Sequence, residues 1–277
     1  MLQTAEPEAP ARRRVWIWGV PFAPLTLEET VAAVSELIRA RRPSFFITAP
    51  THYAMLTEQY ADLREINERA AFIAADGKPL VWASRMQGEP LPERVAGSDL
   101  IFHLCERAAS EGFRVFLLGG AAGVAEVAAS RLVERYPGLN IVGTECPPFR
   151  PTSPEEEAAM LDRIRAAEPD LLFVAFGQPK GERWILRHYE ALGVPVSVQV
   201  GASLDFAAGR VRRAPRWMQK SGLEWLFRMA LEPRRLAGRY ARNARFGARK
   251  LVFCCRFFPS PVGIRINARP LKTKSDN

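Results

Sequence analysis

The stretch DLLFVAFGQPKGERWILRHYEALGVPVSVQVG (170–201) joins two continuous apolar segments through a helix-forming one. The apolar segments, 170–177 and 194–201, are short and rich in Val, Leu and Phe, which is typical of strands buried on both faces. Residues 180–192 are predicted to form a helix with Pro179 at its first turn. A strand, a long helix and a second strand predict a parallel pair with a helical crossover.

This alternation runs through most of the chain. Residues 15–22 are predicted to form a first strand or hairpin arm, and Thr26 with Glu29 forms a capping box that begins a helix. Further apolar strands are expected at 44–49, 71–76, 114–120 and 139–144, and further helices at 53–69, 78–86, 98–111, 122–136 and 153–167. The predicted fold class is α/β, a Rossmann-like parallel sheet flanked by helices.

After Gly209 the strand pattern stops and arginine becomes frequent. Fourteen Lys or Arg residues stand against two acidic ones in residues 210–256, here called the C-terminal segment, whereas the rest of the chain is slightly acidic. The formal net charge of +9 therefore comes from this segment. The predicted organisation is a disordered tail (1–14), a Rossmann-like domain (15–209), a basic helical appendage (210–256) and a loose tail (257–277).

Cysteine usage and hydropathy indicate a cytoplasmic protein. The four cysteines lack CxxC spacing, and the adjacent pair Cys254 and Cys255 is poor geometry for a disulfide. No secretory signal is recognisable, and no stretch reaches the ~20 apolar residues that span a bilayer.

In an open parallel sheet the ligand crevice lies beyond the carboxyl ends of the strands. Thr48 and Asp76 each follow or end an apolar strand in this way. Asp76 could act as a general base if it is partly desolvated, although Asp before Gly is also a common turn. Gly119 and Gly120 could let backbone N–H groups approach a phosphate, or could simply permit a tight turn.

The polar cluster after residue 177 is a further candidate for this crevice. Gln178 can donate and accept hydrogen bonds, and Lys180 offers a charge for a phosphate. Glu182 and Arg183 could instead lie on a solvated helix face, which is favoured for Arg183. Trp184 is expected to pack in the core.

Metal and cofactor motifs are absent from the sequence. There is no DxD pair, HxxxH, GxxxxGK[ST] or GxSxG, and His52, His103 and His188 lack the spacing of metal ligands. No metal and no cofactor are expected. A nicotinamide-dependent oxidoreductase remains an alternative on layering alone, but the GxGxxG after the first strand is missing.

Six blocks together carry a resemblance to a known family. They are ITAP (47–50) followed by Met55 and Leu56, AADG (74–77) followed by Trp82, ERVAGSDL (93–100), VFLLGG (115–120), FVAFGQPKGERW (173–184), and the long run from Gly201 to Tyr240. In this order they resemble the WecG/TagA/CpsF glycosyltransferases, over about Trp18 to Tyr240.

The resemblance implies an inverting, metal-independent transfer of a sugar from a UDP-sugar to an undecaprenyl-diphosphate-linked sugar. N-acetylmannosamine or its uronic acid is the expected sugar, with UDP-glucose as the alternative in exopolysaccharide assembly. It implies catalytic roles for Asp76 as base, Thr48 and Arg228. Substrate contacts are expected from Arg94, Gln178, Lys180, Gly119, Gly120, Arg235 and Asp205.

Two positions depart from the family pattern. Pro50 stands where relatives often have Asn, and Gly181 stands where many have Gln. Both departures bear on the donor sugar more than on the reaction type.

The C-terminal segment is also expected to hold the protein on a membrane. Its arginines alternate with apolar residues such as Trp217, Trp225 and Leu226, a composition typical of an interfacial helix on an anionic leaflet. The predicted partners are the UDP-sugar, the lipid-linked acceptor and the anionic surface, with self-association of the body possible and nucleic acid disfavoured. The expected location is the inner face of the cell membrane.

Overall fold

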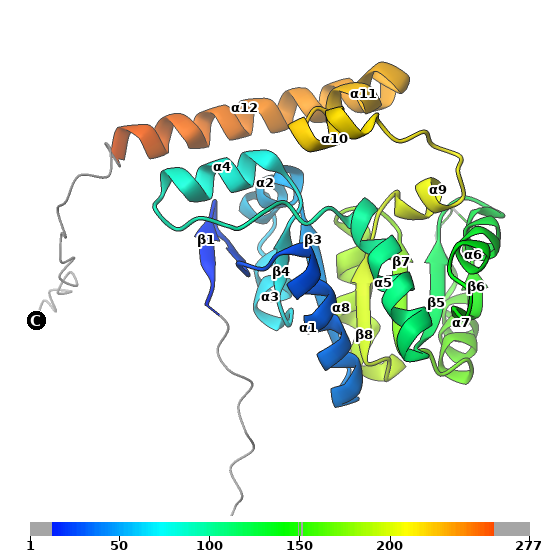
Figure 1. Ribbon diagram of the computed structural model, residues 1–277. Helices are drawn as coiled ribbons and strands as arrows, with labels where there is room; N and C mark the ends of the chain where they lie inside the picture. Colours follow the sequence, from blue (N-terminus) through cyan, green and yellow to red (C-terminus); the bar gives the residue numbers. More distant parts are fainter. Residues whose placement is uncertain (1–12, 149, 151, 258–277) are drawn as a thin grey trace, which may run out of the picture.

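The computed structural model describes residues 13–148, 150 and 152–257 (Figure 1). Its central sheet has the strand order β4-β3-β8-β7-β5-β6, and every pair in it is parallel. These strands are β3 (Ser44–Ala49), β4 (Ile73–Ala75), β5 (Arg114–Gly119), β6 (Asn140–Glu145), β7 (Leu171–Ala175) and β8 (Val196–Gln199). The predicted α/β fold with a helix-flanked parallel sheet is confirmed.

Residues 15–22 form a separate hairpin of two antiparallel strands, β1 (Val15–Ile17) and β2 (Val20–Phe22). Its turn consists of Trp18 and Gly19, both with positive φ (51° and 82°). Two such residues in succession give the tight turn that matches the twist of the strands, as in type I′ hairpins.

Helices cover both faces of the sheet because successive strand residues point to opposite sides. On β7, Leu172 and Val174 belong to one apolar core and Phe173 to the other. One side of the sheet is covered by α1 (Leu27–Ala40), α5 (Gly97–Glu111), α6 (Val124–Arg135) and α9 (Ser203–Ala207). The core on the other side includes residues of α2 (Thr51–Gln59), α3 (Asp62–Arg69), α4 (Lys78–Met86), α7 (Pro154–Ala166) and α8 (Lys180–Leu192).

The predicted helix at 53–69 is wrong in its continuity. The chain breaks between α2 and α3, where Tyr60 adopts an extended backbone (φ −123°, ψ 115°). The break allows Leu56 on one side and Leu63 on the other to enter the same core. Tertiary packing therefore overrides a sequence that contains neither Gly nor Pro at this point.

The C-terminal segment folds into α10 (Arg216–Ser221), α11 (Glu224–Leu231) and α12 (Pro233–Phe257). Figure 1 shows α12 lying along the top of the molecule, above α2 and α4. Phe246 of α12 packs edge-on against Trp18 of the hairpin turn, with ring centroids 5.5 Å apart. Asn243 lies 3.2 Å from His52 of α2. The segment is thus docked on the body along most of its length.

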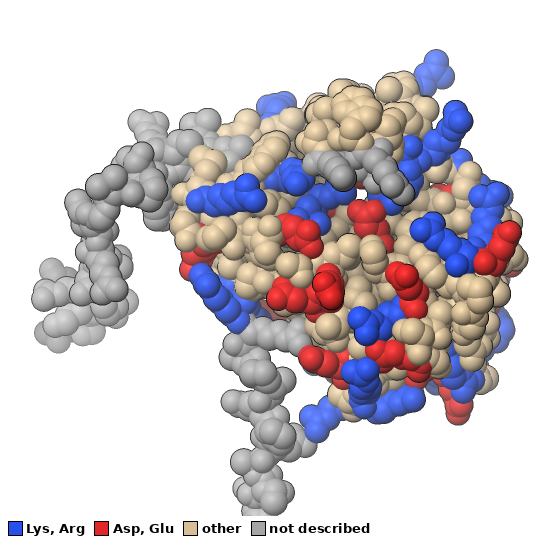
Figure 2. Space-filling view, viewed as in Figure 1, with Lys and Arg blue, Asp and Glu red and all other residues tan. Residues whose placement is uncertain are grey.

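The face seen in Figure 2 carries basic side chains at its upper edge, where the C-terminal segment lies, and also over the body, where they are mixed with acidic ones. Among the described residues, no helix combines the length and the apolar character required to cross a bilayer.

Candidate active site

Asp76 lies at the carboxyl end of β4, beside the end of β3. Its backbone N–H donates to the Ala49 carbonyl at 3.0 Å, and one carboxylate oxygen accepts from the Gly97 N–H at 3.3 Å. Thr48 of β3 is buried, with its hydroxyl 3.4 Å from the Gln199 carbonyl of β8. The ends of three adjacent strands therefore bring Asp76 and Thr48 together, as the strand-end rule predicts.

Burial raises the pKa of Asp76 above its ordinary value. The Arg94 guanidinium and the Gly97 N–H favour the charged carboxylate and partly offset this, whereas the carboxylates of Glu224 and Asp99 add to the rise. A carboxyl group with a raised pKa, held by a backbone N–H, has the properties of a general base.

Gln178 also belongs to this group. It follows β7, and its amide Nε2 lies 3.5 Å from the Thr48 carbonyl, across the neighbouring strand ends. Its side chain is only half-buried. The Gln178 amide therefore belongs to the same group of strand-end residues as Thr48 and Asp76.

Gly119 and Gly120 have structural reasons to be glycine. Both have positive φ (107° and 85°), and a Cβ on Gly119 would lie 3.0 Å from the Ala175 backbone of β7. At Gly120 the same atom would lie 3.1 Å from Val124, the first residue of α6. The tight-turn explanation is thus sufficient for both, and an open approach to their N–H groups is compatible with it.

Lys180, Asp205 and Arg228 are the remaining predicted residues whose side chains the structure describes. Lys180 is exposed, with its ammonium 5.5 Å from the Phe176 ring. Asp205 is half-buried on α9. Arg228 of α11 lies over the Phe206 ring at 5.4 Å, and its Nε is buried without a hydrogen-bond partner in the described residues. The Arg235 side chain lies outside the described residues.

Glu182 is a residue whose burial the sequence pattern did not reveal. A solvated helix face was one prediction for it, but the side chain is buried, and neither carboxylate oxygen has a hydrogen-bond partner in the described residues. Burial raises the pKa of Glu182 to about 7, although the nearby Gln178 amide favours the charged form. Arg183 forms an exposed ion pair with Asp62, and Trp184 is buried, as expected for both.

Gly181 has a packing explanation. A Cβ at this position would lie 2.4 Å from Cγ of the buried Gln199 on β8. The Gln199 side chain therefore occupies the space that a larger residue at 181 would need. Its amide Nε2 is buried without a partner in the described residues.

The C-terminal segment reaches the candidate site at two points that sequence reasoning missed. A Cβ on Gly222, which has a φ of 78°, would lie 2.7 Å from Cγ of Lys78, two residues after Asp76. Glu224 is buried and bridges Arg94 at 3.5 Å and Arg213 at 3.7 Å. Neither contact leaves a signal in the local sequence, because the partners are distant in the chain.

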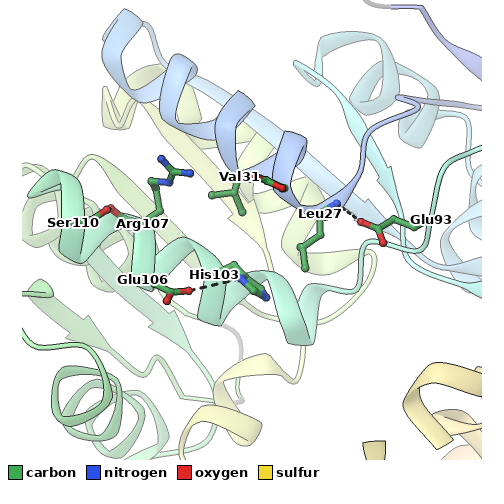
Figure 3. A pocket seen from close by; sticks show the side chains of 8 residues that line it. Leu27, Val31, Glu93, His103, Glu106, Arg107 and Ser110 are labelled. Atoms are coloured by element: carbon green, nitrogen blue, oxygen red, sulfur yellow. Dashed lines mark hydrogen bonds and ion pairs between the residues drawn. The ribbon is translucent and has the colours of Figure 1, made fainter. Parts of the chain in front are cut away.

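A groove of about 500 Å³ lies elsewhere, between α1 and α5 (Figure 3). Several of its polar groups are already paired, since Glu93 accepts from the Leu27 N–H at 2.6 Å and His103 faces Glu106 at 3.8 Å. None of the predicted site residues lines it. In the described part of the chain, no three His, Cys, Asp or Glu residues are grouped as a metal site would require.

Comparison with known proteins adds a family and named relatives. Residues 15–258 match the model described as the Glycosyl transferase WecG/TagA/CpsF family. An N-acetylglucosaminyldiphosphoundecaprenol N-acetyl-beta-D-mannosaminyltransferase of Bacillus spizizenii is 31% identical over 69% of this chain and 73% of its own length. The protein of the same name from Staphylococcus aureus is 31% identical over 80% of this chain and 87% of its own.

Proposed function

The chain belongs to the WecG/TagA/CpsF family and is a glycosyltransferase, and we propose that it moves N-acetylmannosamine from UDP to N-acetylglucosaminyl-diphospho-undecaprenol. The names of the relatives supply the transferred sugar and the acceptor. The observation in this chain that carries the proposal is the position of Asp76, which directly follows β4, has a pKa raised by burial and accepts from the Gly97 N–H.

The proposed chemistry is a single displacement with inversion. Asp76 removes the proton from the acceptor hydroxyl while that oxygen forms a bond to the anomeric carbon. The bond between this carbon and the UDP oxygen breaks, and UDP leaves with the electron pair. General-base assistance of this kind contributes roughly 10² to 10⁴ in rate.

The leaving diphosphate needs positive charge and N–H donors at the crevice. Arg228 suits this role because its buried Nε has no partner in the described residues. We assign the same role to Gln178 and Thr48, which lie together at the strand ends, and to the exposed Lys180. Arg94 is engaged by Asp99 and Glu224, so we assign it to the support of the Asp76 carboxylate. No step in this scheme uses a metal ion.

Membrane attachment through the C-terminal segment is part of the same proposal. Trp217, Trp225, Leu226 and Leu231 are exposed, which is unusual for large apolar side chains. Arginines lie among them, and basic residues near an anionic leaflet contribute about 1 kcal/mol each. A lipid-linked acceptor and a surface-bound enzyme would meet at this surface.

A donor and acceptor panel tests the function. The full chain is incubated with UDP-N-acetylmannosamine, its uronic acid, UDP-glucose or a GDP-sugar, and with a short-chain lipid-diphosphate N-acetylglucosamine. The proposal expects a product mass increased by one N-acetylmannosamine. If only glucose is transferred, the donor is UDP-glucose, the alternative given above. If no UDP-sugar supports transfer, the proposal is overturned.

A further inference from the structure

Glu224 is an acidic residue in a segment that is otherwise strongly basic, and it is buried. It is the first residue of α11, where a carboxylate also interacts favourably with the helix N-terminus. A buried carboxylate is costly unless it is paired. The partners of Glu224 therefore decide how α11 lies on the body.

Those partners form a closed network of four charges. Glu224 faces Arg94 at 3.5 Å and Arg213 at 3.7 Å, and Asp99 of α5 faces the same two arginines at 3.5 and 2.7 Å. Two guanidinium groups are thus balanced by two carboxylates. Asp99 belongs to the body, so Glu224 is the contribution of the C-terminal helices to the network.

Three members of this network act electrostatically on the proposed base. Arg94 is the charge that most favours the ionised form of Asp76, and Glu224 and Asp99 oppose it. Two residues before Glu224, Gly222 closely approaches Lys78, which leaves no room for a Cβ. One helical turn after Glu224, Arg228 lies over Phe206, the ring that Arg213 also covers at 5.8 Å.

We propose that Glu224 is a positioning residue for the transfer reaction. By engaging Arg94 and Arg213, it fixes the start of α11 on the strand ends and sets Arg228 at the crevice. It also partly neutralises Arg94 and so limits how strongly this guanidinium stabilises the Asp76 carboxylate. The catalytic part of this inference rests on the proposed function, but the docking part does not.

Glu224→Gln in the full chain tests the proposal by two readouts. Backbone amides of α11 are expected to exchange hydrogen at least tenfold faster, because the helix loses its ionic contact. kcat/KM is expected to fall by about tenfold to a hundredfold as Arg228 is misplaced. The acid limb of the kcat/KM profile is expected to move to lower pH, because a negative charge that raises the pKa of Asp76 is removed.

The matched control is Glu58→Gln, at the other end of the docked segment. Glu58 pairs with Arg249 at 3.0 Å and with Lys250, so this variant also removes a contact between body and C-terminal segment. Because the pair is partly exposed and includes none of the residues proposed for the site, activity within about twofold of the parent and an unmoved acid limb are expected. Glu224→Asp keeps the charge and should keep the acid limb in place while loosening α11.

A Glu224→Gln protein that keeps α11 protected and the acid limb in place overturns the proposal, whatever its rate. A raised kcat/KM would also overturn it, since Glu224 would then obstruct the crevice. If the parent transfers no sugar at all, the proposed function fails, whereas the exchange measurement still decides whether Glu224 docks α11.

Discussion

At the scale of single residues, burial of the Glu182 carboxyl group costs free energy that other interactions in the fold have to offset. Its carboxyl is buried one residue after Gly181, and the pKa is raised to about 7 by burial. Burial raises the pKa of the Tyr53 phenol, and the negative charge of Glu182 adds to this rise. A buried carboxyl without a hydrogen-bond partner is expected to remain protonated below neutral pH.

This burial makes the free energy of unfolding depend on pH. The folded chain keeps the proton on Glu182 up to about pH 7, whereas the unfolded chain releases it near the ordinary value of 4.5, so stability falls as pH rises between these values. Glu182→Gln should remove this fall and gain about 2 to 4 kcal/mol above pH 7. Urea unfolding at pH 5 and 8 measures it, with the exposed Glu65→Gln as control. Equal stability of the Glu182→Gln protein and the parent at pH 8 would contradict the account.

At the scale of elements, the contact between α8 and β8 explains Gly181. The predicted helix at 180–192 coincides with α8, because its apolar period and Pro179 are local signals. Gln199 on the neighbouring strand is what forbids a side chain at 181. No local pattern could reveal this, since the two residues meet only when the sheet has formed. Gly181 is therefore explained by packing, without reference to the donor sugar.

Gly181→Ala should destabilise the protein by about 1 to 3 kcal/mol, because the added methyl overlaps Gln199. Gln199→Ala in the same chain should recover most of the loss, since the two sites share one space. Gly238→Ala on α12 is the control, as nothing lies within 4 Å of a Cβ there. Urea denaturation of the three variants measures the effect, and an unaffected Gly181→Ala protein would refute the packing explanation.

At the scale of the whole molecule, the sequence was enough to predict the parallel sheet and the cluster of Asp76, Thr48 and Gln178 at its strand ends. Both follow from local patterns and the strand-end rule. The docking of the C-terminal segment was not predictable in this way. It depends on pairs such as His52 and Asn243, which are 191 positions apart in the chain. The burial of Glu182 and the network around Glu224 belong to the same class of long-range contact.

Membrane binding is a property of the whole docked molecule. Trp217→Glu places a charge at a side chain that is 64% exposed, and it should weaken flotation with anionic vesicles by several fold at unchanged stability. Val133→Glu is the control, because Val133 is exposed on α6, a helix that lies apart from α10, α11 and α12 in Figure 1. Flotation equal to the parent for Trp217→Glu would exclude this surface as the lipid contact.

The most direct measurement of the central claim compares Asp76→Asn with the parent in the transfer assay and in UDP binding. Asparagine keeps the shape of the side chain and its place near the Gly97 N–H but cannot accept the acceptor's proton. We predict that turnover falls by about 10² to 10⁴ while the affinity for UDP stays within about twofold. Near-parental turnover of the Asp76→Asn protein would contradict the assignment of the base and, with it, the proposed mechanism.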